Sequence, residues 1–337
     1  MVCRRSEIAH PCGWLRTVTA PLPVVSVGNL TFGGTGKTPV VQALAQYCRR
    51  RGYRVAILLR GYRRRSSGLI IVSRGAGPEV PWWESGDEAW LHAWKIPEAL
   101  VIVDRRRERA ARVAHQLGAQ VALLDDGFQY RRLQRALDLV LLDRRTLRCR
   151  FPLPFGCLRE PLRALRRADF LLLSDVTVEA LPSWLRSYPW VEVRFHFGTP
   201  VVWTSDGAQP TTPPAEPVAA FAGIARAERF RRSLQHEGWQ IALWKPFPDH
   251  HPYSLRTLRR LLRTCLRLGI HRLVTTEKDL VRLMPLLEEF QRWGVEVMSV
   301  PLTASFGAGA ARLWHRLDGL LQQHGGSAED IPQHLKG

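Results

Sequence analysis

A glycine-rich segment between an apolar run and a helical pattern constrains the fold of this chain more than any other feature. Residues 24–27 form a short β-branched run that predicts a buried strand, and residues 28–38 follow as a glycine-rich loop. Helical periodicity then covers residues 39–51 and ends at Gly52. A strand that passes through glycines into a helix N-terminus predicts an α/β domain with an anion-binding loop at that helix end.

The strand signal recurs along the first half of the chain. Apolar runs without period-2 alternation occur at residues 55–59, 101–103, 121–124, 139–142 and 170–173, and helical stretches separate several of them. Strands of this kind are buried on both faces, so we expect a parallel sheet with helices on each side.

A change of pattern around residues 191–217 predicts a second domain. An alternating run at 191–197, a run at 201–204 and a Pro-rich stretch at 209–217 predict a two-stranded linker and a hinge. A second α/β block follows them. The expected division is a basic arm at 1–22, a first domain at 23–190, the linker at 191–217, a smaller domain at 218–324 and a polar tail at 325–337.

Composition narrows the functional classes. The chain has 337 residues and a formal net charge of +19, which indicates either a polyanionic partner, such as a nucleotide, a nucleic acid or an anionic membrane surface, or an arginine-rich solvated surface without a partner. No aromatic-interleaved basic module or helix-turn-helix pattern occurs, so no nucleic-acid partner is expected. No apolar run reaches the ~18 residues that a membrane span needs. The six cysteines form no C-x-x-C pair, so we expect neither a zinc site nor a disulfide framework, but a cytoplasmic protein with reduced thiols.

The glycine-rich loop has the residues of a phosphate-binding loop. Its glycines allow backbone N–H groups to surround phosphate oxygens, Lys37 can reach the β- and γ-phosphates, and the Thr38 hydroxyl can hold Mg²⁺. The strict pattern requires glycine five residues before Gly36, where this chain has Thr31, so a glycine-rich turn with an incidental lysine is the alternative. The predicted nucleotide-binding residues are Thr31, Phe32, Gly33, Gly34, Thr35, Gly36, Lys37 and Thr38.

Carboxylates are expected at the end of a neighbouring strand. The apolar residues 121–124 end in Asp125, Asp126 and Gly127, like a Walker-B strand, so either aspartate could bind Mg²⁺ directly or through water. A helix-capping pair of aspartates at a turn is the alternative.

Four further motifs are ambiguous on local grounds. Gly-Asp-Glu at residues 86–88 opens a helix, where acidic residues ordinarily complement the helix dipole. Arg-Gly-Tyr at 60–62 and Arg-Glu at 159–160 fit either a ligand contact or a plain turn. A polar loop at 247–253 contains paired histidines, for which an acid–base role is favoured over a metal site because no cysteine lies nearby.

In combination these motifs resemble the tetraacyldisaccharide 4′-kinases of lipid A biosynthesis, over residues 21 to 283. The motifs are Ser-Val-Gly-Asn-Leu-Thr at 26–31, Gly-Gly-Thr-Gly-Lys-Thr-Pro at 33–39, Arg-Gly-Tyr at 60–62, Gly-Asp-Glu at 86–88, Asp-Asp-Gly-Phe-Gln at 125–129, Leu-Arg-Glu-Pro at 158–161, Asp-His at 249–250 and Thr-Thr-Glu-Lys-Asp at 275–279. The resemblance implies an α/β fold with a P-loop NTPase-like parallel-sheet domain, joined by a β-ribbon to a smaller α/β/α domain.

The same resemblance implies an activity and a place. The family transfers the γ-phosphoryl of ATP to the 4′-hydroxyl of tetraacyldisaccharide 1-phosphate, an acylated glucosamine disaccharide, and so forms lipid IVA. We therefore expect ATP and Mg²⁺ as cofactors and a site in the cleft between the domains. The expected location is peripheral, at the cytoplasmic face of the bacterial inner membrane.

Roles carry over motif by motif. Lys37 and Thr38 are expected to hold the ATP phosphates and Mg²⁺, while Asp87 accepts the proton of the sugar hydroxyl and His250 pairs with it across the cleft. The remaining metal residues implied are Asp125, Asp126 and Glu160. The implied substrate contacts are Asn29, Arg60, Tyr62, Gln129 and Arg159.

The sequence departs from the family pattern at several positions. Tyr130 replaces the usual histidine after Asp-Asp-Gly-Phe-Gln, and Ala89 replaces the usual proline after Gly-Asp-Glu. The turn at 223–227 contains fewer Gly and Pro residues than the corresponding turn of the family. We therefore do not expect domain closure to follow the family pattern in every detail. The N-terminal arm is shorter than the family's membrane-dipping helix, so contact with an anionic membrane depends on Trp14, the neighbouring arginines and the net charge.

Two other functions are compatible with parts of the sequence. The loop alone would suit another P-loop ATPase or GTPase, such as a metallochaperone or an ATP-dependent ligase. A metallochaperone should carry a Cys-rich metal motif, which is absent, although residues 276–279 imitate a guanine-selecting loop. The net charge alone motivates a non-enzymatic nucleic-acid binder.

Overall fold

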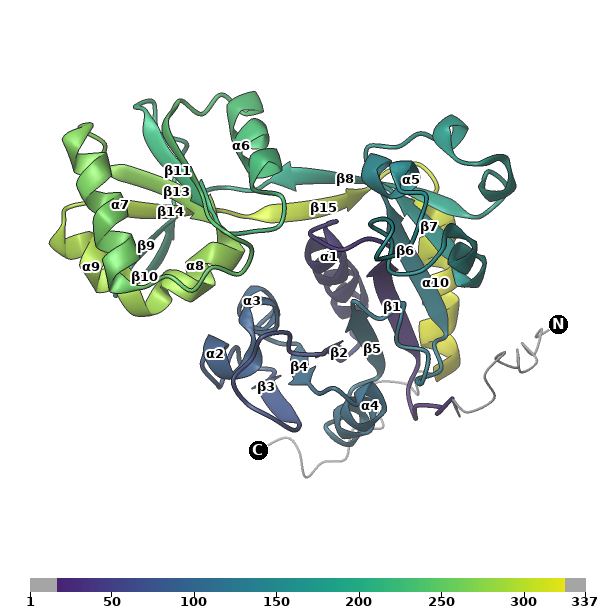
Figure 1. Ribbon diagram of the computed structural model, residues 1–337. Coiled ribbons are helices and arrows are strands. Elements are labelled where there is room, and N and C mark those ends of the chain that lie inside the picture. Colours follow the sequence, from purple (N-terminus) through teal and green to yellow (C-terminus); the bar gives the residue numbers. More distant parts are fainter. Residues whose placement is uncertain (1–16, 325–337) are drawn as a thin grey trace.

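The protein is described here by a computed structural model covering residues 17–324. Two α/β domains are joined by a long two-stranded ribbon (Figure 1), which confirms the predicted fold class. The predicted basic arm at 1–22 lies largely outside the described residues, and the predicted tail at 325–337 lies wholly outside them. Within residues 17–324, no helix combines the length and the apolar character needed to cross a membrane.

The first domain is built on a nine-stranded sheet of order β15-β8-β7-β6-β1-β5-β2-β4-β3. The strands from β8 to β4 run parallel, and the two edge strands, β15 and β3, are antiparallel to their neighbours. The central strands are buried along their whole length, as their unbroken apolar runs predict. The strands are β1 (Val24–Asn29), β2 (Val55–Leu59), β3 (Ile70–Arg74), β4 (Leu100–Val103), β5 (Val121–Asp125), β6 (Leu137–Leu142), β7 (Phe170–Leu173), β8 (Trp190–Phe197) and β15 (Leu302–Phe306).

Helices cover both faces of this sheet. One face packs against α1 (Lys37–Arg50), α3 (Asp87–Lys95) and α10 (Ala310–His324). The other face packs against α4 (Arg107–Gln116), α5 (Arg144–Arg148) and the 3₁₀ helix η1 (Leu162–Arg167). Three short elements complete the domain: α2 (Trp82–Ser85), η2 (Val178–Ala180) and η3 (Ser183–Leu185).

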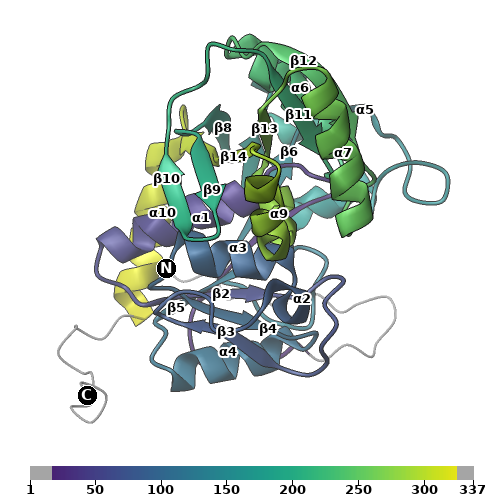
Figure 2. The ribbon, with the colours of Figure 1, turned by 90° about the vertical axis from the view of Figure 1, so that its left-hand side faces the viewer.

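The second domain has a six-stranded sheet of order β10-β9-β14-β13-β11-β12. Its strands are β9 (Val201–Thr204), β10 (Gly207–Pro210), β11 (Val218–Ala222), β12 (Ile241–Pro246), β13 (Arg272–Thr276) and β14 (Glu296–Val300). One face carries α6 (Ala227–His236), and the other carries α7 (Leu255–Arg267), α8 (Glu277–Leu283), η4 (Met284–Leu286) and α9 (Leu287–Arg292). The helical stretch between β13 and β14 is divided into α8 and α9, because Pro285 interrupts it within η4. Figure 2 shows α3 between the first sheet and this second domain, and α3 contacts α8 there.

The ribbon between the domains differs from the prediction. Residues 193–197 of β8 continue past the first sheet and pair antiparallel with β15, not with the run at 201–204. That run is β9, which belongs to the second sheet beside β14. A hairpin pattern reports only on neighbouring segments, so it could not reveal a pairing between segments this far apart in the sequence.

The last helix also differs from the prediction, because α10 returns to the first domain. Leu313 and Leu317 are buried in the core of that domain with Leu44 of α1. Tyr47 of α1 stacks on Trp314, with ring centroids 4.0 Å apart. The second domain therefore ends with β14, and β15 and α10 carry the chain back.

The cysteines provide a further correction. Cys149 and Cys157 form a disulfide with a Cα–Cα distance of 5.9 Å, whereas reduced thiols are expected from the sequence. Cys48 and Cys265 are free and buried. The two bonded cysteines are eight residues apart, a spacing that matches no standard motif. The disulfide depends on how the loop between them folds, which the sequence pattern does not reveal.

Candidate functional site

The glycine-rich loop has the predicted strand–loop–helix form. It connects β1 to α1, which begins at Lys37, and Gly33 and Gly36 adopt positive φ angles of 99° and 93°. A Cβ atom on Gly36 would lie 2.2 Å from Cζ of Phe195 in β8. Glycine is therefore required at Gly36 both by the backbone conformation and by the ribbon packed against it.

Lys37 is the centre of a polar group at the carboxyl ends of β1 and β5. Its Nζ donates to Asn29 Oδ1 at 3.1 Å and lies 3.3 Å from Asp126 Oδ1. Arg159 Nη1 donates to both oxygens of Asp126 at 2.7 Å, and Gln129 Nε2 donates to the backbone oxygen of Asn29 at 2.9 Å. The structure thus brings together residues from four separate predicted motifs.

The charges around Asp126 decide its protonation. Burial on its own would raise the pKa of this carboxyl, but Lys37 and Arg159 outweigh burial, and the pKa lies below its ordinary value. Asp126 also adopts a left-handed backbone conformation, with φ of 60°. The group therefore presents an ionised carboxylate beside an ammonium at the start of α1.

The two aspartates of the Asp-Asp-Gly motif face different partners. Asp125 lies 2.9 Å from Nε2 of His92, and both side chains are buried. His92 is missed by the sequence reasoning, and its only signal is a histidine among the apolar residues of α3. It fixes the direction of the Asp125 carboxylate.

The four metal residues implied by the resemblance, Thr38, Asp125, Asp126 and Glu160, stay a prediction, and their carboxylates contact other side chains. Among residues 17–324, no group of three or more His, Cys, Asp or Glu side chains is placed to hold a metal ion. Glu160 pairs with Arg167 at 2.8 Å. Thr38 is buried in the first turn of α1.

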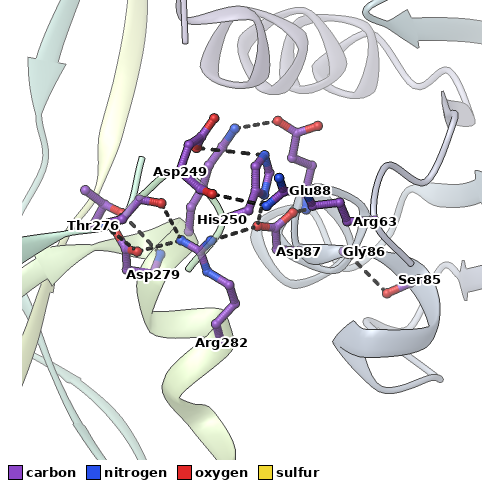
Figure 3. A network of polar contacts seen from close by, with 12 residues as sticks. Arg63, Ser85, Gly86, Asp87, Glu88, Asp249, His250, Thr276, Asp279 and Arg282 are labelled. Atoms are coloured by element: carbon purple, nitrogen blue, oxygen red, sulfur yellow. Dashed lines mark hydrogen bonds and ion pairs between the residues drawn. The ribbon is translucent and has the colours of Figure 1, made fainter. Parts of the chain in front are cut away.

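Asp87 and His250 point toward each other from opposite domains (Figure 3). Asp87 is the first residue of α3 and is 6% exposed, and its Oδ2 lies 3.0 Å from Nδ1 of His250. His250 has a φ of 56°, and its backbone N–H donates to the Gly223 oxygen at 2.9 Å. Arg282 of α8 adds a second cation, with Nη1 at 3.7 Å from Asp87. A carboxylate and an imidazole therefore meet across the domain boundary.

Each member of the Asp87–His250 pair favours the charged form of the other, the Asp87 carboxylate and the His250 imidazolium. Burial would raise the pKa of Asp87, but the hydrogen bond with His250 and the charge of Arg282 lower it below the ordinary value. The hydrogen bond to Asp87 in turn raises the pKa of His250 above its ordinary value, although burial opposes this. Asp87 is therefore ionised at neutral pH, which is the form that can accept a proton, although its lowered pKa makes it a weaker base.

With this geometry established, comparisons with known proteins assign the family. The family model described as LpxK, tetraacyldisaccharide-1-P 4′-kinase, matches residues 1–322. The chain belongs to this family of kinases.

Individual relatives agree with that assignment. Tetraacyldisaccharide 4′-kinase from Chlorobium chlorochromatii is 39% identical over 80% of this chain and 76% of its own, and that from Chlorobaculum tepidum is 35% identical over 96% and 95%. The crystal structure of LpxK from Aquifex aeolicus in complex with ATP superposes with a TM-score of 0.75. The two sequences are 33% identical, and the match covers 92% of this chain and 91% of the Aquifex chain.

In this member of the kinase family, ion pairs that involve the Thr-Thr-Glu-Lys-Asp and Gly-Asp-Glu motifs join the two domains. Lys278 of the Thr-Thr-Glu-Lys-Asp motif pairs with Glu88 of the Gly-Asp-Glu motif at 2.6 Å, and Glu277 pairs with Lys95 at 2.7 Å. The charge of Lys278 lowers the pKa of Glu88. These ion pairs hold α8 against α3 and keep His250 opposite Asp87.

Asp279 of the same motif organises the second domain's side of the site. It accepts hydrogen bonds from the Tyr253 hydroxyl at 2.7 Å, the Gly223 backbone N–H at 2.9 Å and Arg282 Nη2 at 2.5 Å. Tyr253 ends the polar loop at 247–253, but the sequence reasoning assigned it no role there, and Arg282 lies in no recognisable motif.

The remaining predicted contacts lie at the edge of the site. Tyr62 is exposed, and its ring centroid is 5.4 Å from that of His250. Arg60 is exposed at the end of β2. Tyr130, at the position of the usual family histidine, donates its hydroxyl to Glu108 and lies beneath Arg107, whose Cζ is 4.5 Å from the ring centroid.

Proposed function

We propose that this chain transfers the γ-phosphoryl of ATP to the 4′-hydroxyl of tetraacyldisaccharide 1-phosphate and so forms lipid IVA. The observation that carries the proposal is the pairing of Asp87 with His250 across the two domains, in a chain whose phosphate loop and family are those of the lipid 4′-kinases. ATP as the donor is supported by the related structure, which is a complex with ATP. A metallochaperone, a ligase or a nucleic-acid binder has no comparable support.

The phosphate loop would bind and align the triphosphate. The backbone N–H groups of residues 33–38 and the N-terminus of α1 attract phosphate oxygens. Lys37 already lies between Asn29 and Asp126, so its ammonium is held at the start of α1 and can neutralise charge on the β- and γ-phosphates. Alignment and charge neutralisation are the largest contributions to phosphoryl transfer.

The hard oxygen donors beside Lys37 suit Mg²⁺. This ion is usually held by one or two carboxylates together with substrate phosphates and water, so an all-protein cage is not required. The Thr38 hydroxyl and the ionised carboxylate of Asp126 would hold it, with the Asp125 side chain as the alternative ligand. When bound, Mg²⁺ neutralises charge on the transferring phosphate. Glu160 would join the set only after leaving Arg167.

Asp87 would act as the base. The proton of the 4′-hydroxyl passes to its carboxylate while the sugar oxygen forms a bond to the γ-phosphorus. The bond from that phosphorus to the β–γ bridging oxygen breaks, and ADP leaves with its electrons. His250 and Arg282 keep Asp87 ionised beforehand and hold its direction.

The predicted substrate contacts fit a polar head group at the mouth of the site. Tyr62 beside His250, and Gln129 and Arg159 beside Asp126, would contact the disaccharide, with Arg60 at the margin. Asn29, also predicted as a substrate contact, is fully buried and accepts a hydrogen bond from Lys37, so it would act on the site through that lysine. The acylated part of such a substrate resides in a bilayer. We therefore propose a peripheral position on the anionic cytoplasmic face of the bacterial inner membrane.

The test is a kinase assay with purified protein, Mg-ATP and the disaccharide monophosphate in detergent. We expect phosphate on the 4′ position, no transfer by the Lys37→Met or Asp87→Asn variants, and normal transfer by Lys245→Met, which changes an exposed lysine on β12. Intact ATP binding without transfer to this acceptor would contradict the proposal. Preferential binding of GTP would favour the alternative of another P-loop nucleotidase.

A further inference from the structure

We propose that the loop from Cys149 to Cys157, the apolar loop, enters the interfacial layer of an anionic lipid bilayer and holds the cleft against that surface. The inference rests on the proposed function in one respect, because an acylated substrate places the reaction at a membrane. The observations that carry it are the exposure, the fold, the charge and the connections of this loop.

The apolar loop exposes three large apolar side chains within five residues. Phe151, Leu153 and Phe155 are 60%, 56% and 87% exposed. Single exposed hydrophobic residues are ordinary, whereas a contiguous apolar patch marks an interaction surface. Phe155 is almost wholly surrounded by solvent, so the loop presents a tip rather than a pocket.

The loop is folded in a way that keeps these side chains outward. The disulfide between Cys149 and Cys157 closes its base. Within it, the Leu153 N–H donates to the Leu158 oxygen at 3.0 Å, and the Leu158 N–H donates to the Phe151 oxygen at 3.3 Å. A Cβ atom on Gly156 would lie 2.1 Å from the Phe151 oxygen, so glycine permits the close turn. The backbone therefore supports the exposed tip instead of letting it collapse onto the domain.

The charge around the loop identifies the surface that it fits. The segment from residue 144 to residue 159 contains five arginines and no acidic residue. Arg148 and Arg150, which precede Phe151 in the sequence, are both exposed. Apolar side chains flanked by arginines are the pattern of a segment that lies in a bilayer interface and contacts anionic head groups.

The loop is also connected directly to the phosphate-binding side of the site. Leu158 forms a β-bridge with Thr31, and the Arg159 N–H donates to the Leu30 oxygen at 2.6 Å. The Arg159 guanidinium then reaches Asp126 at 2.7 Å and lies over the half-exposed Phe32. A bilayer contacted by the loop would therefore lie beside the site, where the head group of a lipid can enter while its chains stay in the membrane.

The test is partition onto vesicles that contain no substrate. Full-length protein is mixed with vesicles of phosphatidylcholine alone or with phosphatidylglycerol, and bound protein is measured by flotation. We expect stronger binding to the anionic vesicles, and about a tenfold or greater loss for Phe151→Ser/Leu153→Ser/Phe155→Ser. Arg148→Gln/Arg150→Gln should weaken binding to the anionic vesicles only.

The matched control is Leu255→Ser/Leu268→Ser, which removes two exposed leucines from the ends of α7 in the second domain and should leave partition unchanged. Thermal midpoint and ATP binding show that each variant is folded. Unchanged partition of the triple variant, an equal loss in the control, or no vesicle binding by the parent protein would overturn the inference.

A kinase readout separates this inference from the proposed function. The triple variant should phosphorylate detergent-dispersed substrate normally but show a raised KM for substrate in vesicles. Normal transfer together with unchanged partition would reject the membrane role and keep the kinase assignment. Loop-dependent partition by a protein that transfers no phosphate would reject the kinase assignment and keep the membrane role.

Discussion

Replacement of His250 tests the link between the two domains and the base. His250→Ala removes the partner that lies 3.0 Å from Asp87 and leaves Arg282, at 3.7 Å, as the nearest cation. Because the hydrogen bond and charge of His250 lower the pKa of Asp87, that pKa must rise when they are lost. His250→Gln is the matched variant, since it keeps a side-chain donor but has no charge.

The size of the effect follows from the strength of this contact. A hydrogen bond to a charged group contributes about 1.5–3 kcal/mol, and one pKa unit corresponds to about 1.4 kcal/mol. The acid limb of kcat/KM should therefore move up by about one to two pH units in His250→Ala, and by less in His250→Gln. The raised pKa of His250 should also set an alkaline limb in the parent enzyme, which both variants lose.

The assay is 4′-phosphorylation of detergent-dispersed substrate measured from acid to alkaline pH, with circular dichroism at each pH. The parent, the two variants and Asp87→Asn are compared at saturating Mg-ATP. An acid limb that stays in place in His250→Ala would refute the idea that this imidazole keeps Asp87 ionised. Full activity of Asp87→Asn would remove Asp87 from the base role.

The other predictions concern the phosphate loop, the ion pair between Lys278 and Glu88, the metal ion and the stability of the fold. Gly36→Ala should lose nucleotide binding, measured by calorimetry, because Gly36 has a positive φ and an added Cβ would meet Phe195. The double variant Gly36→Ala/Phe195→Ala should not recover binding, because the positive φ at residue 36 remains. Lys278→Met, which breaks the pair with Glu88, should lower kcat/KM by about tenfold through looser domain closure, whereas the exposed-site variant Lys245→Met should not. Chelation should abolish phosphoryl transfer, and added Mg²⁺ should restore it. The Asp87–His250 pair stabilises the fold most between about pH 4 and 6.5; in pH-dependent melting its contribution should fall below that window as Asp87 protonates, and above it as pH passes the raised pKa of His250.

Local patterns predict the parts of the site that depend on consecutive residues. The run from β1 into α1 fixes the phosphate loop, because glycines and a lysine at a helix start leave few other structures. The parallel core strands are also predictable, since unbroken apolar runs require burial on both faces. Their carboxyl ends lie at one edge of the sheet, which brings Asp126 to Lys37.

The features that the sequence does not reveal depend on pairing between distant segments. β15 pairs with β8 only after the whole second domain has intervened, and its own residues carry little strand signal. Helix α10 has an ordinary amphipathic pattern that fits either domain, and its contacts with Tyr47 and Leu44 decide the matter. His92 and Arg282 act through buried contacts with Asp125 and Asp279, which no spacing rule anticipates.

In the proposed mechanism, the phosphate loop binds ATP with its γ-phosphate facing the Asp87–His250 pair. A crystal structure with Mg²⁺ and a non-hydrolysable ATP analogue is the most direct test of this arrangement. We predict that the terminal phosphate lies in the loop at residues 33–38, in contact with Lys37, and that Asp87 faces the side of the γ-phosphorus from which a hydroxyl would attack. A triphosphate bound elsewhere, or Asp87 directed away from the γ-phosphorus, would contradict the account.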